Sequence, residues 1–248
     1  MTFDTPLITG RFLRRYKRFF ADVELDDGRV VTAHCPNTGA MTGCMQPGWR
    51  VLLSRSDDPR RKLAYTWELI HNGRCWICIN TMHANRLVAE ALAGGDSRSA
   101  IVREVSGDFP PGRAHITREA AWPDASGRCD FLVSYRPPRA RRERRCFIEV
   151  KSVTLKRGDA LEFPDAPSER ARRHLEALMR VRAAGDRALL LFLAQRSDAR
   201  LVRPARAVDP EYADLLGRAR AAGVEVVAYQ TKITKRGMYV ARALPVEL

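Results

Sequence analysis

The chain has 248 residues, 43 of them basic and 29 acidic, which gives a formal net charge of +14. This length allows one large or two small domains, and we expect two. An excess of positive charge favours a polyanionic partner. Only six of the basic residues are lysines, however, and an arginine bias also follows from the codon usage of a GC-rich genome. Clustering of the charges is therefore better evidence than their number.

The pattern of apolar residues argues against a membrane-spanning protein and against a secreted one. No apolar run approaches eighteen residues, and the first residues lack the charged and apolar regions of a signal peptide. We therefore expect a cytoplasmic protein without a membrane span. Its six cysteines are then expected to remain thiols.

The first 80 residues resemble a series of short strands. Strands are expected over residues 11–25, 29–35, 49–54, 63–71 and 74–80. Asp26-Asp27-Gly28 and Asn72-Gly73 separate neighbouring runs and are typical hairpin turns. Five strands in this length fit a small closed barrel such as an OB-fold, which would suit nucleic acid.

A cluster in the first strand mixes cations with aromatic rings. It consists of Arg14, Arg15, Tyr16, Lys17 and Arg18, followed by two phenylalanines. Such a combination can follow a phosphate backbone and stack on bases, so these five residues are candidate DNA-binding residues. A solvated basic strand face with its aromatic rings in the barrel core explains them equally well.

The remaining pattern predicts an α/β (α+β) fold. A helix is expected over residues 80–93, ending at Gly94-Gly95, and we place the domain boundary here, giving domains 1–80 and 81–248. Strands at 115–122, 128–135 and 146–153 precede a helix at 168–184 and a strongly apolar strand at 187–195. A helix opened by Asp209-Pro210 and a strand at 224–231 complete a mixed sheet between helices.

Three charged residues lie in two of these apolar strands. Side chains alternate along a strand, so Glu149 and Lys151 share one face. Asp130 lies six residues before the loop 136–145 and Glu149 four residues after it, so antiparallel pairing brings them nearly opposite each other. Facing carboxylates repel unless a cation lies between them, and two hard oxygen ligands supplemented by water suit Mg²⁺, with Mn²⁺ as a substitute. Lys151 could orient the attacking water or stabilise charge in the transition state.

The alternative is a solvated salt bridge between Glu149 and Lys151, with Asp130 merely beginning a strand. The flanking residues Phe147, Ile148 and Val150 leave no clean polar face. A strand covered on both sides seldom carries charges that are not paired or bound to metal. This favours a metal-dependent nuclease site with Asp130 and Glu149 as metal ligands.

Longer stretches of the chain carry a family resemblance. They are residues 15–19 (RYKRF), 34–44 (HCPNTGAMTGC), 66–69 (TWEL), 85–86 (NR), 148–155 (IEVKSVTL), 163–166 (FPDA) and 244–246 (LPV). Through them the chain resembles the sugar fermentation stimulation protein A family of bacteria. The resemblance implies a five-stranded OB-like barrel, then a restriction-endonuclease-like PD-(D/E)XK domain. It also implies DNA binding with little sequence preference and a regulatory role in maltose and sugar metabolism.

The resemblance also assigns residues. Asp130 matches the acidic position of the nuclease motif, Glu149 and Lys151 match its E-x-K, and Glu119 matches an acid sometimes found upstream. A strand-end surface glutamate explains Glu119 equally well. The loop 36–43 is either a phosphate contact or a structural turn. Two functions follow: a DNA-binding regulator with a nuclease-like site, or an active Mg²⁺-dependent nuclease on DNA or RNA. Fold alone does not choose between them.

Overall fold

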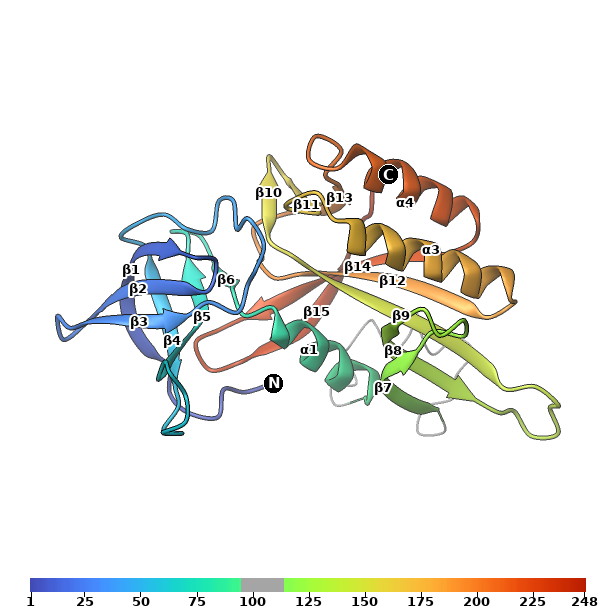
Figure 1. The fold of residues 1–248 in the computed structure, drawn as a ribbon, viewed down its shortest axis with the longest axis horizontal. Coiled ribbons are helices and arrows are strands. Elements are labelled where there is room, and N and C mark those ends of the chain that lie inside the picture. Colours follow the sequence, from blue (N-terminus) through green and yellow to red (C-terminus); the bar gives the residue numbers. More distant parts are fainter. Residues whose placement is uncertain (95–113) are drawn as a thin grey trace.

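The computed structural model describes residues 1–94 and 114–248 and contains a barrel beside a mixed sheet with helices (Figure 1). The barrel strands are β1 (Ile8–Tyr16), β2 (Phe20–Leu25), β3 (Val30–His34), β4 (Arg50–Arg55), β5 (Tyr65–His71) and β6 (Trp76–Cys78). Their order is β3-β2-β1-β4-β5-β6, and a short parallel pairing of β3 with β5 closes the sheet. The expected OB-like barrel is confirmed.

One barrel prediction was wrong. Residues 11–25 form a hairpin, β1 and β2, instead of a single strand, and Tyr16 pairs with Phe20 across its turn. Lys17 and Arg18 both have left-handed backbones, with φ of 46° and 63°. Asparagine and glycine usually supply this conformation in hairpin turns. Two basic residues in their place left no turn signal in the sequence.

The mixed sheet contains the strands that carry the candidate acids. It consists of β7 (His115–Ala121), β8 (Arg128–Tyr135), β9 (Arg144–Val153), β12 (Arg187–Ala194), β14 (Glu225–Ile233) and β15 (Met238–Leu244). The order is β15-β14-β12-β9-β8-β7, with β9 parallel to β12 and antiparallel to β8. A smaller sheet combines β10 (Leu155–Arg157), β11 (Ala160–Phe163) and β13 (Leu201–Pro204). The sequence did not predict β10, β11, β13 or β15, because their short or mixed patterns lack a clear apolar alternation.

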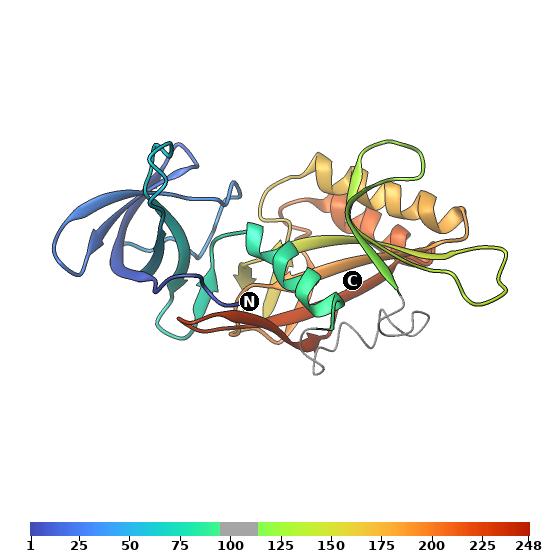
Figure 2. The ribbon, with the colours of Figure 1, turned by 90° about the horizontal axis from the view of Figure 1, so that it is seen from below.

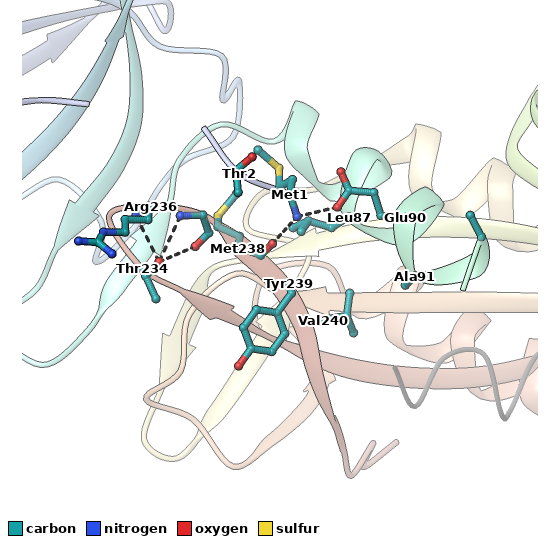
Figure 3. Close-up of a pocket in the computed structure, with 12 residues that line it drawn as sticks. Met1, Thr2, Leu87, Glu90, Ala91, Thr234, Arg236, Met238, Tyr239 and Val240 are labelled. Atoms are coloured by element: carbon teal, nitrogen blue, oxygen red, sulfur yellow. Dashed lines mark hydrogen bonds and ion pairs between the residues drawn. The ribbon is translucent and has the colours of Figure 1, made fainter. Parts of the chain in front are cut away.

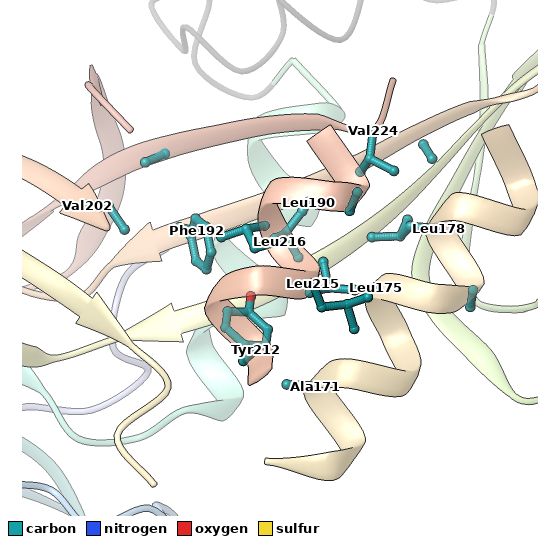
Figure 4. Close-up of a cluster of buried hydrophobic side chains, with 14 of the residues drawn as sticks. Ala171, Leu175, Leu178, Leu190, Phe192, Val202, Tyr212, Leu215, Leu216 and Val224 are labelled. Carbon is teal, nitrogen blue, oxygen red and sulfur yellow. The ribbon is translucent and has the colours of Figure 1, made fainter. Parts of the chain in front are cut away.

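Helices cover both faces of the mixed sheet, as the turned view in Figure 2 shows. Helix α1 (Met82–Leu92) packs on one face, and α3 (Glu169–Ala183) and α4 (Pro210–Ala221) pack on the other. The core beneath α3 and α4 includes Leu175, Phe192 and Tyr212 (Figure 4). The core beneath α1 joins barrel residues such as Leu69 to sheet residues such as Ile148. Because β9 is buried on both faces, its sequence is a nearly continuous apolar run.

The helix ends follow from local chemistry. Ser168 caps α3 by accepting from the N–H of Ala171, and Asp209 caps α4 by accepting from the N–H of Tyr212. The N–H of Ser168 donates to Asp209, which fastens the two helices together. Helix α1 ends at Leu92, and Gly94 follows with a φ of 76°, whereas the predicted second stop residue, Gly95, lies outside the described residues. None of the helices in the described ranges is long and apolar enough to cross a membrane.

Candidate functional site

Glu149 and Lys151 form an ion pair on β9. Lys151 Nζ lies 2.7 Å from Glu149 Oε1, and the two side chains are 11% and 4% exposed for the lysine and the glutamate. A solvated surface salt bridge would leave both side chains accessible to water. The pair is instead enclosed between β9 and α3, where the loss of hydration makes each remaining contact stronger.

Asp130 joins this pair from the neighbouring strand β8. Phe131 and Ile148 form the last pair between β8 and β9, and Asp130 and Glu149 are the next residues of the two strands. Asp130 Oδ2 accepts the backbone N–H of Val150 at 2.7 Å, where the strand-to-strand ladder has ended. Its Oδ1 accepts from Asn85 Nδ2 of α1, also at 2.7 Å. Two strands and a helix therefore converge on this carboxylate.

The two acids have opposite pKa shifts. Burial and the nearby charge of Glu149 raise the pKa of Asp130, despite the hydrogen bonds from Val150 and Asn85. Burial would also raise the pKa of Glu149, but hydrogen bonds and charges from His174 and Lys151 outweigh it and lower that pKa. Glu149 is thus held as an anion beside an acid that resists a second negative charge.

His174 of α3 completes the cluster and was missed by the sequence analysis. Its Nδ1 is in hydrogen-bond contact with Glu149 Oε1 and lies 3.2 Å from Lys151 Nζ. Since a carboxylate only accepts, Nδ1 is the donor to Glu149. In the sequence, the one indication of this role was that His174 precedes Leu175 and lies on the edge of the helix face that we expected to point inward.

One carboxylate oxygen of the cluster has no partner. Glu149 Oε2 is buried and receives no hydrogen bond, whereas Oε1 receives two. Within residues 1–94 and 114–248, no three His, Cys, Asp or Glu side chains are arranged to hold a metal ion. The predicted metal ligands Asp130 and Glu149 stay a prediction.

Glu119 lies at a distortion in β7. The pairing of β7 with β8 joins Arg118 to Phe131 and Ala120 to Cys129, and omits Glu119. Glu119 has a left-handed φ of 51° and an exposed side chain. It lines a cleft of about 640 Å³ that His174 also lines. It is thus near the cluster, on the wall of this cleft, and its proposed catalytic role stays a prediction.

Some residues of the basic cluster of the barrel contact other protein groups, and others lie exposed at a hairpin tip. Arg14 pairs with Asp22 at 2.8 Å, and Tyr16 stacks on Phe20 with ring centroids 5.5 Å apart. Arg15 donates to the backbone carbonyls of residues 37 and 39. Lys17 and Arg18 are exposed at the tip of the hairpin. Contact with DNA stays a prediction for this cluster.

The loop 36–43 holds the barrel against the second half of the chain. The N–H of Met41 donates to Asp165 at 3.2 Å, and Cys44 Sγ lies 3.9 Å from the carbonyl of Thr154. Arg196 donates to the same carbonyl at 3.0 Å. Thr154 directly follows β9, so these contacts brace the end of the strand that carries Glu149 and Lys151. The contact of Met41 with Asp165 supports the structural alternative for this loop.

An apolar cavity lies elsewhere. Its volume is about 610 Å³, and it lies between α1 and the β14–β15 hairpin (Figure 3). The amino group of Met1 lies 2.6 Å from Glu90 and donates to the carbonyl of Met238 at 2.7 Å. Neither Asp130 nor Glu149 lines this cavity. It contributes nothing to the acidic cluster.

Comparisons with known proteins agree with this architecture. Residues 82–237 match the model of the sugar fermentation stimulation protein RE domain, and residues 13–79 match the SfsA N-terminal OB domain. The chain belongs to the sugar fermentation stimulation protein (SfsA) family. Homologues with this name in Syntrophotalea carbinolica and Geobacter sulfurreducens are 47% and 44% identical to it. The matches cover 100% of this chain and of the first homologue, and 99% of this chain and 98% of the second.

A solved structure shares the complete SfsA architecture. It is the structure of Pyrococcus furiosus SfsA in complex with Ca²⁺, which is similar to this chain with a TM-score of 0.78 and 26% sequence identity. The match covers 100% of this chain and 98% of that one. The barrel and the mixed sheet are therefore arranged alike in both proteins.

Proposed function

We propose that this SfsA-family protein binds DNA with little sequence preference and carries a Mg²⁺-dependent nuclease-type site at Asp130, Glu149 and Lys151. The observation that carries the proposal is the buried, unpartnered Glu149 Oε2, beside an Asp130 whose pKa is raised by burial and by Glu149. A divalent cation would satisfy the first oxygen and neutralise the repulsion between the two carboxylates.

The donor set fits Mg²⁺. Carboxylate oxygens are hard ligands, and Mg²⁺ in proteins usually takes one or two carboxylates and retains several waters. Both Asp130 oxygens accept hydrogen bonds, but each keeps a second lone pair for a ligand. The Pyrococcus relative was solved in complex with Ca²⁺, another cation that prefers oxygen ligands, which supports a cation in this family. Mn²⁺ is the expected substitute.

The remaining groups of the cluster suit phosphodiester chemistry. A bound Mg²⁺ would polarise the phosphate and lower the pKa of a bound water. Lys151 donates once to Glu149, so its other two N–H groups are available for a phosphate oxygen or the attacking water. Its charge is nearly buried, and fixed charges stabilise a transition state best where water is excluded.

The complete set of Asp130, Glu149 and Lys151 favours DNA or RNA cleavage over binding alone. The alternative is a regulator of sugar metabolism that binds DNA and retains a nuclease fold without turnover. The support for that alternative comes from the family name, whereas the support for cleavage comes from the buried cluster itself.

A cleavage assay separates the two functions. Purified protein is incubated with single- and double-stranded DNA and RNA in Mg²⁺, Mn²⁺ or EDTA, beside Lys151→Ala. We expect metal-dependent products from the native protein and a loss of at least about 10²-fold in rate for the variant, since one electrostatic donor is typically worth that much. Products that persist in EDTA or in Lys151→Ala would point to a contaminating nuclease and contradict the assignment.

Calorimetry tests the metal site without any cleavage. Asp130→Asn should abolish Mg²⁺ binding because it removes one of the two carboxylates. It should leave salt-sensitive DNA binding nearly unchanged, since that binding depends on basic residues elsewhere. Unchanged Mg²⁺ binding in Asp130→Asn would defeat the nuclease-site proposal and leave the DNA-binding proposal standing.

A further inference from the structure

The cleft that opens at His174 has one strongly basic wall. Arg170, Arg173 and Arg180 line it from α3, and Arg128 lines it from the start of β8. Among the described residues that line it, two are carboxylates, Glu119 and Glu176. Four arginines against two glutamates give the lining a formal charge of +2. The lining residues come from α3 and from the connection between β7 and β8, and Figure 1 shows these two segments side by side.

The arginines of α3 form a single row. Arg170, Arg173, His174, Ala177 and Arg180 follow helical spacing, so they share one face of the helix. The ten steps along the chain from Arg170 to Arg180 extend over about 15 Å of helix axis. One strand of duplex DNA has a phosphate every 3.4 Å or so of its axis, so the row matches about four phosphates.

Several of these guanidinium groups are weakly engaged. Arg170 contacts His174 Nε2 at 3.5 Å, at the limit of a hydrogen bond. Arg173 pairs with Glu169 at 3.2 Å, but both side chains are exposed, and such pairs contribute little. A phosphate group can therefore replace these partners at small cost. Arg180 is different, because its bonds to Asp124 and Ser126 tie the two walls together at the far end of the cleft.

The floor of the cleft favours contacts to the backbone over contacts to bases. Trp122 packs edge-on against His174, with centroids 6.5 Å apart, and is only 4% exposed. A buried indole is not available for stacking on a base, as single-strand binding surfaces require. Arginines aimed at phosphates carry no sequence information by themselves. The surface thus fits binding with little sequence preference.

The cleft adjoins the acidic cluster through His174. His174 lines the cleft and also contacts Glu149 and Lys151, so a strand lying along the arginine row would pass close to the proposed cleavage point. We infer that this arginine row binds the phosphodiester backbone of the nucleic-acid strand next to the phosphate to be cleaved. The inference rests on the proposed function and adds the surface that positions the strand.

The test removes two charges from the row and two from a neighbouring helix. Binding of fluorescently labelled single-stranded and duplex DNA is measured by anisotropy from about 0.05 to 0.3 M salt, in EDTA so that no metal contributes. The variant is Arg170→Ala with Arg173→Ala. The matched control is Arg218→Ala with Arg220→Ala, which removes two exposed arginines from α4. Circular dichroism melts verify that each variant is folded.

Each lost phosphate contact should lower the slope of log affinity against log salt by about 0.9 on duplex DNA and about 0.7 on a single strand. The row variant should therefore lose up to about 1.8 on duplex DNA, and its affinity at 0.1 M salt should fall at least about tenfold. The α4 control should retain the native slope. A row variant whose slope equals that of the control would overturn the inference.

Failure of the proposed function gives a different result. If the native protein shows no salt-dependent binding to DNA, the DNA-binding proposal itself is wrong. If the native protein binds but the row variant keeps its slope, only the arginine row is wrong. Because the assay contains EDTA, an absence of Mg²⁺ binding or cleavage would not affect either reading.

Discussion

Gly39 of the barrel lies so close to Asp165 that a Cβ atom at residue 39 would collide with the Asp165 carboxylate. The same carboxylate accepts the N–H of Met41, and Arg15 holds the loop from the barrel side through the carbonyl of Gly39. Asp165 lies three residues before Ser168, the cap of the helix that carries His174. The contact between Gly39 and Asp165 therefore joins the barrel to the segment that leads into α3, the helix that carries His174.

Gly39→Ala should therefore destabilise the protein. Forcing a methyl group into a packed contact typically costs about 1–3 kcal/mol. Asp165→Ala removes the obstacle, so the double variant should cost less than the sum of the two single changes. Urea unfolding of the native protein, the two single variants and the double variant measures this coupling. Additive effects would show that Gly39 and Asp165 do not constrain each other.

The basic cluster of the barrel should show two different behaviours on mutation. Lys17→Ala with Arg18→Ala should weaken DNA binding and lower its salt slope, with little change in stability, because both side chains are exposed. Arg15→Ala should instead destabilise the protein by about 1–3 kcal/mol, because the carbonyls of residues 37 and 39 lose their donor. Anisotropy and thermal melts on both variants distinguish these effects. If the Lys17/Arg18 variant and Arg15→Ala lost the same stability, the distinction between exposed and structural residues of this cluster would be wrong.

His174 should matter to metal affinity through Glu149. His174→Leu removes the donor to Glu149 Oε1 and should weaken Mg²⁺ binding by about 10- to 100-fold, the usual effect of losing an outer-shell partner. His174→Asn keeps a donor and should recover part of that affinity. Calorimetry of the native protein and the two variants measures it. If His174→Leu bound Mg²⁺ as tightly as the native protein, His174 would have no role in positioning Glu149.

Glu68 should make stability depend on pH. This buried carboxylate accepts from Ser54 at 2.6 Å and Asn80 at 2.8 Å, and it lies 2.7 Å from His83 Nε2. Burial would raise the pKa of Glu68, but hydrogen bonds from His83, Ser54 and Asn80 outweigh it and lower that pKa. The stabilisation is therefore present above the unfolded value of about 4.3 and is lost as the pH falls through the lower folded value.

Glu68→Gln removes this contribution and should cost about 2–3 kcal/mol at pH 7. The difference from the native protein should shrink as the pH falls through the lowered pKa of Glu68, where the native carboxylate also loses its charge. Urea unfolding at pH 7, 5 and 3.5 measures this difference in the free energy of unfolding. The control is Glu24→Gln, a change at an exposed residue of the barrel. A constant difference across this range would rule out the charge of Glu68 as its source.

The strands that carry Asp130, Glu149 and Lys151 could be predicted from the amino-acid sequence. Alternation along a strand is a local property, and the apolar neighbours of Glu149 already indicated a strand buried on both faces. The barrel and the two capped helices were predictable for the same reason, since turn residues, caps and periodicity involve neighbours in the chain. Where the local signal was absent, as at Lys17 and Arg18, the prediction was wrong.

The side chains that surround those strands could not be predicted, because they depend on tertiary packing. His174 and Asn85 reach the acids because α3 and α1 pack on opposite faces of the sheet, and no local pattern specifies which side chain then lies at the contact. The same holds for Gly39, whose need for a missing Cβ arises from Asp165 of a distant segment. Burial and charge set the pKa values of Asp130 and Glu149, and both depend on this packing.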